Sequence, residues 1–129
     1  MHAILSADAP APAGHYSQAQ VAAGLVFVSG QLPILQPSMA IPEGIEAQLR
    51  LAMRHVEHIL RAAGSSLAHV VSVQIFITDV ALWPQVNQVY AQIMGAHKPA
   101  RTIVPVGPLH YGALVEINAV AELAAPAQD

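Results

Sequence analysis

The segment from residue 44 to residue 63 constrains the fold more than any other part of the sequence. Its apolar residues recur at steps of three and four, the spacing of an amphipathic helix that buries one stripe: Ile45, Leu49, Ala52, Val56, Ile59, Leu60 and Ala63. Opposite charges lie four residues apart on it, in the order that stabilises a helix: Glu46 with Arg50, and Glu57 with Arg61. The segment therefore predicts a long helix with one face in the core.

The rest of the chain alternates between strand and helix patterns. Apolar or β-branched segments predict strands at residues 25–29, 70–78, 101–106 and 114–122, and a second apolar stripe predicts a helix at 82–93. The order strand, helix, strand, helix, strand, strand predicts an α+β fold of one domain, residues 1–129, with both helices on one face of a sheet. We expect the last two strands to pair with each other, the proline-rich segment 31–42 to form a loop, and the Ala- and Pro-rich ends, 7–13 and 124–129, to be loose.

The composition indicates what covers the face of the sheet that carries no predicted helix. Charged residues make up 10% of the chain and hydrophobic residues 54%, whereas a typical charged share is about 25%. Such a chain is either a membrane protein or a subunit that hides surface in an oligomer. The longest uninterrupted apolar run spans only residues 21–28, and a spanning helix needs about 20 residues. Composition and the missing third helix therefore predict that another subunit covers the sheet.

Several kinds of site are excluded or disfavoured. The absence of cysteine excludes disulfides, thiolate metal sites and cysteine nucleophiles. A net charge of -3 with five Lys and Arg cannot form a phosphate-tracking surface, so we expect no nucleic-acid partner. His55 and His58 have a spacing close to that of helical metal pairs, but they fall on the polar side of the predicted helix without acidic ligands, so we expect solvated histidines and no metal. No signal-peptide pattern precedes the first strand, which favours a cytoplasmic protein.

Two charged residues stand out because they lie inside apolar strands. Arg101 opens the segment 101–106, where a lone arginine needs a partner. Its planar guanidinium suits bidentate capture of a carboxylate, although an ion pair with Glu116 or another acid would satisfy it equally. Glu116 could carry a proton or position a water, or it could be a structural or solvent-facing carboxylate.

Two further positions are weaker candidates. Tyr16 follows Gly14-His15, and such a tyrosine is usually a packing residue with a locally satisfied hydroxyl. Ser29-Gly30-Gln31 ends a predicted strand, where the hydroxyl and nearby backbone N–H groups could meet a ligand or simply form a turn.

Together these pieces resemble the Rid (reactive intermediate deaminase, YjgF-type) family over nearly the whole chain. The matching pieces, in order, are GHYSQ at 14–18, VSGQLP at 28–33, Gln48, AAG at 62–64, VNQVY at 86–90, PAR at 99–101 and VEINAVA at 115–121. The order and spacing make the resemblance specific, although each piece alone is weak.

The resemblance implies a fold, an assembly and an activity. The fold would be a chorismate-mutase-like α+β domain that forms homotrimers, with active sites at the subunit interfaces. The activity would be hydrolysis of 2-enamino or 2-imino acids to 2-keto acids and ammonia, without cofactor or metal. By analogy Arg101 would bind the substrate carboxylate, Glu116 would position water and Tyr16 would close the site. The site would be lined by Ser29, Gly30 and Ile103, with Asn87 as a supporting polar group.

The chain departs from the family pattern around the expected cleft. His15 and His110 replace common prolines, Asn118 replaces a second glutamate, and the segment 90–101 is shorter and lacks an aromatic pair. These departures leave the substrate open. A non-catalytic trimeric binder of small carboxylates is the alternative to a deaminase, and the acidic balance disfavours a ribonuclease.

Overall fold

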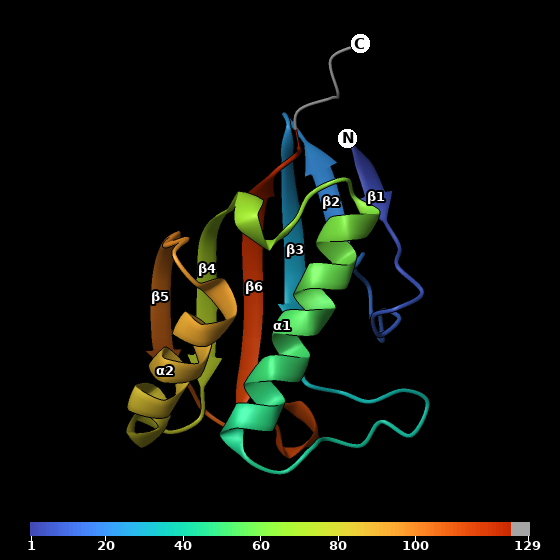
Figure 1. Ribbon diagram of the computed structural model, residues 1–129. Helices are drawn as coiled ribbons and strands as arrows, with labels where there is room; N and C mark the ends of the chain where they lie inside the picture. Colours follow the sequence, from blue (N-terminus) through green and yellow to red (C-terminus); the bar gives the residue numbers. More distant parts are fainter. Residues whose placement is uncertain (125–129) are drawn as a thin grey trace.

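The computed structural model describes residues 1–124, which form one six-stranded sheet and two α-helices (Figure 1). The elements, in chain order, are β1 (His2–Ile4), β2 (Ala19–Ala22), β3 (Leu25–Gln31), α1 (Ile45–Ala62), β4 (Val70–Ile77), α2 (Trp83–Met94), β5 (Ala100–Pro105) and β6 (Val115–Glu122). Short 3₁₀ turns at Leu67–His69, Val80–Leu82 and His110–Gly112 connect them. The α+β class and both helices are confirmed, while β1 and β2 are strands that the sequence pattern did not predict.

The strand order of the sheet is β1-β2-β3-β6-β4-β5. β4 and β5 are parallel, and every other neighbouring pair is antiparallel. The expectation that the last two strands pair is therefore wrong, because β4 lies between β5 and β6. The helix α2 carries the chain back over the sheet, which is the connection that parallel neighbours need, and the segment after β5 then crosses β4.

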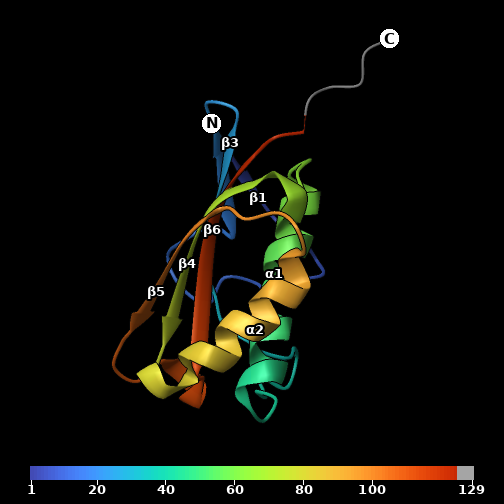
Figure 2. The same ribbon diagram turned by 60° about the vertical axis from the view of Figure 1, so that its left-hand side comes forward.

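Both helices lie on the same face of the sheet, and Figure 2 shows this layering from the side. The apolar stripe of α1 packs on the buried side of the central strands. Alternate residues of β6 lie on the same side: Val115, Ile117, Ala119 and Ala121. The opposite face carries no helix from residues 1–124, and Phe27 and Val71 are each 45% exposed on the strands. The fold thus has one covered and one open sheet face.

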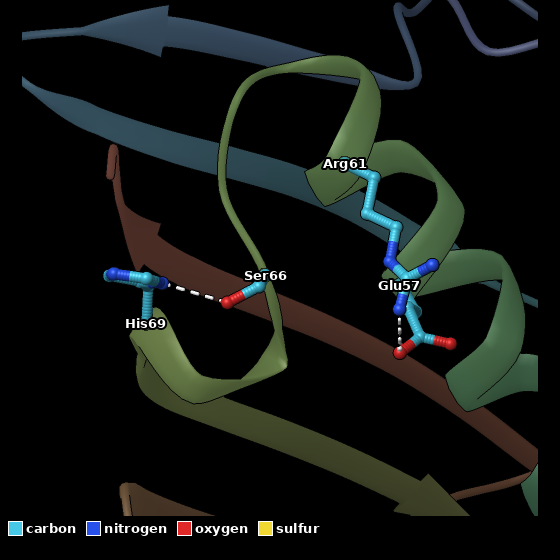
Figure 3. A network of polar contacts seen from close by, with 4 residues as sticks. All are labelled: Glu57, Arg61, Ser66 and His69. Carbon is cyan, nitrogen blue, oxygen red and sulfur yellow. Dashed lines mark hydrogen bonds and ion pairs between the residues drawn. The ribbon is translucent and has the colours of Figure 1, made fainter. Parts of the chain in front are cut away.

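The surface of α1 carries the ion pairs that its sequence predicted. Arg50 and Glu46 lie 3.9 Å apart, and Arg61 and Glu57 lie 3.3 Å apart. Beyond the end of the helix, Ser66 and the Nδ1 atom of His69 are 2.7 Å apart (Figure 3). These exposed pairs add little to stability, so the burial of the apolar stripe is what holds α1 in place.

The N-terminal segment is not loose, contrary to expectation. Ala9 is buried, and the buried amide of Gln18 binds the segment at several points. Ser6 N donates to Gln18 Oε1 at 2.6 Å, and Gln18 Nε2 donates to the carbonyl oxygens of Ser6 and Pro10 at 3.1 and 2.9 Å. The other end predicted to be loose, residues 124–129, lies outside the described residues except for Ala124.

Candidate functional site

The predicted site residues gather in two separate hollows. The first, here the Glu116 hollow, has a volume of about 580 Å³ and contains Tyr16, Ser29, Gly30 and Glu116. The second, here the Arg101 hollow, has a volume of about 390 Å³ and contains Asn87 and Arg101. Figure 1 shows the loop before α1 and the turn before β6 together at the lower end of the sheet, where residues of both segments line the Glu116 hollow.

The carboxylate of Glu116 lies directly against Gly30. A β-carbon built on Gly30 would lie 2.8 Å from Glu116 Oε1 and 3.1 Å from Glu116 Cδ. A side chain at this point of β3 would displace the carboxylate, so the observed position of Glu116 depends on glycine here. The carboxylate lies at the end of β3, beside the backbone that the sequence suggested could meet a ligand.

Tyr16 and Ser29 complete this side of the hollow. The Tyr16 ring is 52% exposed, and its hydroxyl accepts a hydrogen bond from the backbone N–H of Ala13 at 3.3 Å. The Ser29 hydroxyl donates to the carbonyl oxygen of Ser17 at 2.7 Å. Its lone pairs remain able to accept a hydrogen bond from a ligand or a water.

Two buried glutamines, which the sequence did not single out for this role, support the walls. Gln18 holds the segment that contributes Pro10 to the hollow. Gln48 on α1 joins two loops, because its Nε2 donates to Pro42 O at 3.0 Å and its Oε1 accepts from Leu114 N at 2.8 Å. A glutamine inside a helical stripe interrupts the apolar pattern, and that interruption was the available signal.

A third wall depends on His55. The sequence predicted that this histidine is solvated, and that prediction is wrong. His55 is buried, and its Nε2–H donates to the carbonyl oxygen of Ile34 at 2.9 Å, so it secures the loop that lines the hollow. Burial lowers the pKa of His55, and the nearby positive groups act in the same direction while the hydrogen bond to Ile34 opposes it. None of the polar atoms in residues 1–124 pairs with its Nδ1.

Arg101 lies away from the Glu116 hollow, on β5, where its side chain contacts α2. Its Nη1 donates to Asn87 Oδ1 at 2.9 Å, and its guanidinium carbon lies 5.0 Å from the Tyr90 ring centre and 5.8 Å from the Trp83 ring centre. Within residues 1–124 it forms no ion pair with a carboxylate. The internal pairing with Glu116 is therefore not what satisfies it, and most of its donors remain available to an anion.

The aromatic residues beside Arg101 hold its guanidinium by cation–π contact. Burial raises the pKa of Tyr90, although the positive charge of Arg101 acts in the opposite direction. Lys98 also lines the Arg101 hollow, whereas Asp and Glu are absent from the described lining. The hollow is therefore suited to a small anion.

Arg101 and Glu116 point to opposite faces of the sheet. Arg101 is paired with buried Val73 across parallel strands, so both side chains lie on the helix-covered face. Glu116 lies between buried Val115 and Ile117 on β6, so its side chain lies on the open face. A single copy of residues 1–124 cannot place both groups on one small ligand.

The remaining predicted residue, Ile103, lines neither hollow. It follows Arg101 by two positions on β5, is paired with Ile75 and packs against the core. No three His, Asp or Glu side chains among the described residues gather where they could share a metal ion. None of the helices formed by residues 1–124 is long and apolar enough to span a bilayer.

Comparison with known proteins identifies the family of the chain. Residues 6–123 match the family model described as Endoribonuclease L-PSP. A RutC family protein of Pyrococcus horikoshii is 40% identical over 119 residues, covering 92% of this chain and 94% of that one. The 3-aminoacrylate deaminase RutC of Acinetobacter baylyi is 39% identical over 121 residues, covering 93% and 96%. The crystal structure of E. coli TdcF with bound serine superposes with a TM-score of 0.90 at 32% identity, covering 96% and 100%.

The six-stranded sheet with both helices on one face defines a small α+β protein. The chain belongs to the Rid family, which includes RutC and carries the family-model description Endoribonuclease L-PSP. The resemblance inferred from the sequence is confirmed over most of the chain.

Proposed function

We propose that this protein is a hydrolytic deaminase of 2-imino and 2-enamino acids. The reaction would be R–C(=NH)–COO⁻ + H₂O → R–CO–COO⁻ + NH₃, and an enamine would enter it after tautomerisation to the imine, in which carbon gains a proton and nitrogen loses one. An imine carbon is already electrophilic, so an oriented water and one proton carrier suffice without a strong nucleophile. The similarity to 3-aminoacrylate deaminase RutC supports this class of reaction.

The observation that carries the proposal is the division of the site between two hollows. Arg101 offers a cation without a carboxylate partner among the described residues, and Glu116 offers a carboxylate on the opposite face. These are the two groups that such a hydrolysis needs, one for the substrate carboxylate and one for the water. They can meet one substrate only if they come from different copies of the chain. We therefore place the active site between subunits of a homotrimer, with the open sheet face inside the assembly.

The roles follow from the contacts. Arg101, oriented by Asn87, binds the substrate carboxylate with its remaining N–H groups. Glu116 of the neighbouring copy positions the water and takes up its proton, while Ser29 and the backbone at Gly30 line the reacting carbon. Tyr16 closes the hollow from the side. The reaction needs no metal or cofactor in this scheme.

Binding without catalysis is the second candidate. The structure of TdcF with bound serine shows that a relative holds a small carboxylate-bearing molecule, which is what the Arg101 hollow suits. Ribonuclease activity has less support, because Arg50, Arg54 and Arg61 lie along α1 and two of them pair with glutamates. A phosphate backbone needs a continuous basic surface.

The direct test is release of ammonia and pyruvate from freshly generated 2-iminopropionate. We expect wild-type protein to accelerate release, and Glu116→Gln to lower turnover much more than it weakens pyruvate binding. Arg101→Ala should weaken pyruvate binding by roughly ten- to a hundredfold, because a hydrogen bond to a charged group contributes about 1.5–3 kcal/mol. Arg101→Lys should recover little of this, and Arg61→Ala on the surface of α1 is the matched control. Pyruvate binding without any acceleration would favour the binding protein.

A further inference from the structure

In a single copy of the chain, the Glu116 hollow contains more space and more aromatic surface than the proposed chemistry needs. Its volume of about 580 Å³ falls within the range of pockets that hold drug-sized ligands. A substrate as small as 2-iminopropionate would fill only a small part of it. The remaining volume lies beside residues that have no role in binding the carboxylate or the water.

The lining of that remaining volume is aromatic and apolar. Tyr16, His110 and Tyr111 contribute rings, and Leu32, Ile34 and Met39 contribute apolar side chains. In the described lining, Glu116 is the sole acid and no Lys or Arg is present. An apolar group is therefore favoured there, while a second carboxylate would meet Glu116 without a compensating cation.

Tyr111, which lines this hollow, occupies a costly backbone conformation. Its φ is 63° and its ψ is 15°, the left-handed region that a bulky residue rarely adopts. The neighbouring Gly112 also has positive φ. Strain of this kind persists where the surroundings enforce it, and it concentrates at ligand sites.

Two hydrogen bonds hold the backbone around Tyr111. Leu114 N donates to Gln48 Oε1 at 2.8 Å, which ties the C-terminal side of the turn to α1, and Ala113 N donates to His110 O at 3.2 Å within the turn. The Tyr111 ring is not used by the core, since the residue is 54% exposed. Its ring centre lies 6.2 Å from that of His110 at a tilt of 52°. The turn thus presents a pair of rings to the hollow, and one of them, His110, stands where the chain departs from the family pattern.

We infer that Tyr111 and His110 form a compartment for the substrate side chain, which selects 2-imino acids with aromatic or large apolar side chains. This inference rests on the proposed deaminase function and specifies its substrate class. The substrate carboxylate binds Arg101 of one copy, the imine carbon lies beside Glu116 of the other, and the side chain lies between Tyr16 and Tyr111. The apolar loop that His55 secures closes the compartment at Ile34.

The test compares 2-imino acids generated in place from phenylalanine, leucine, alanine and aspartate by an amino-acid oxidase with catalase. Their hydrolysis is followed by trapping the unreacted imine with semicarbazide. Wild-type kcat/KM should be highest for the phenylalanine- and leucine-derived imines and lowest for the aspartate-derived imine. Tyr111→Gly should lower the ratio of kcat/KM for the phenylalanine-derived imine to kcat/KM for the alanine-derived imine. The decrease should be about fivefold or more, the size of a lost aromatic contact. Glycine relieves the positive φ, so this variant should fold, and Tyr111→Asn is a second variant that tolerates the same conformation.

A binding measurement separates failure of the compartment from failure of the enzyme. By calorimetry, phenylpyruvate should bind wild type more tightly than pyruvate does, and Tyr111→Gly should reduce that preference. Leu5→Ala removes an exposed apolar side chain outside the hollow and should change neither ratio. A preference for the alanine-derived imine, or an unchanged ratio in both Tyr111 variants, would overturn the compartment while leaving the deaminase intact. If no imine is hydrolysed, the deaminase is refuted, and equal affinity for the two keto acids would then overturn the compartment as well.

Discussion

Mixing two inactive variants tests whether each site is built from two copies of the chain. Arg101→Ala removes the carboxylate anchor and Glu116→Gln removes the water-positioning group, so each variant alone should have little activity. In a mixed assembly, some sites would receive Arg101 from a Glu116→Gln subunit and Glu116 from an Arg101→Ala subunit. Those sites would be fully wild type, and activity should return.

The activity expected of the mixed assembly follows from where the two side chains lie in the sheet. β5 and β6 are separated by β4, and Arg101 and Glu116 are level with Val73 and Phe76 on that strand. Strand spacing and rise place their α-carbons roughly 14 Å apart, with side chains on opposite faces. If each site uses adjacent subunits of a ring, random mixing of equal amounts makes about a quarter of the sites wild type.

The assay is imine hydrolysis after the two variants are unfolded together and refolded, so that subunits exchange. Arg101→Ala refolded with Arg101→Lys is the control, because no site can then contain a wild-type arginine. Activity near one quarter of wild type is expected for the first mixture and none above the parents for the control. Light scattering of the wild-type protein should give the mass of a trimer. Activity of the first mixture no higher than the mean of its parents would refute the shared site.

Two further predictions concern the walls of the Glu116 hollow. Gly30→Ala should lower turnover sharply, because the new β-carbon would displace the Glu116 carboxylate. Stability should change little, because φ at Gly30 is not in the left-handed region. An unaltered kcat would show that the carboxylate position is unimportant. Stability should fall as pH drops below about 6.5, because the lowered pKa of His55 means that the unfolded chain takes up a proton before the folded one does. The measurement is denaturant unfolding at several pH values. His55→Gln, which can still donate to Ile34, should reduce the loss of stability at low pH, whereas the control His58→Gln should retain it. Identical pH profiles for wild type and both variants would show that His55 does not cause the loss.

The sequence predicted the parts of the fold that depend on long periodic patterns. The stripe of α1 and the alternation of β6 were sufficient because each is repeated several times and is buried on one side only. β1 and β2 are too short for such a repeat, and β2 merges with β3 into one apolar run across a tight turn at Ala23 and Gly24. The sequence pattern predicted that β5 and β6 pair because they follow each other in the chain, but β4 lies between them in the sheet.

The site was predictable in its residue types but not in its arrangement. Arg101 and Glu116 stood out as charges in apolar strands, and the structure places each at a hollow. Their opposite directions could not be predicted, because that required knowing that β4 separates the two strands. His55 was misassigned because a histidine in a helical pattern looks solvent-facing unless a loop packs over it.

The two edges of the sheet have a consequence for how copies of this protein can associate. β1 is only three residues long, and β5 is bounded by Pro99 and Pro105, which lack the N–H that a further strand would need. Extension of the sheet by edge-to-edge pairing is therefore disfavoured at both ends. The proposed trimer would instead associate through the open face, where contact ends once that face is covered. A protein with so few charges thereby limits the edge pairing through which fibres grow.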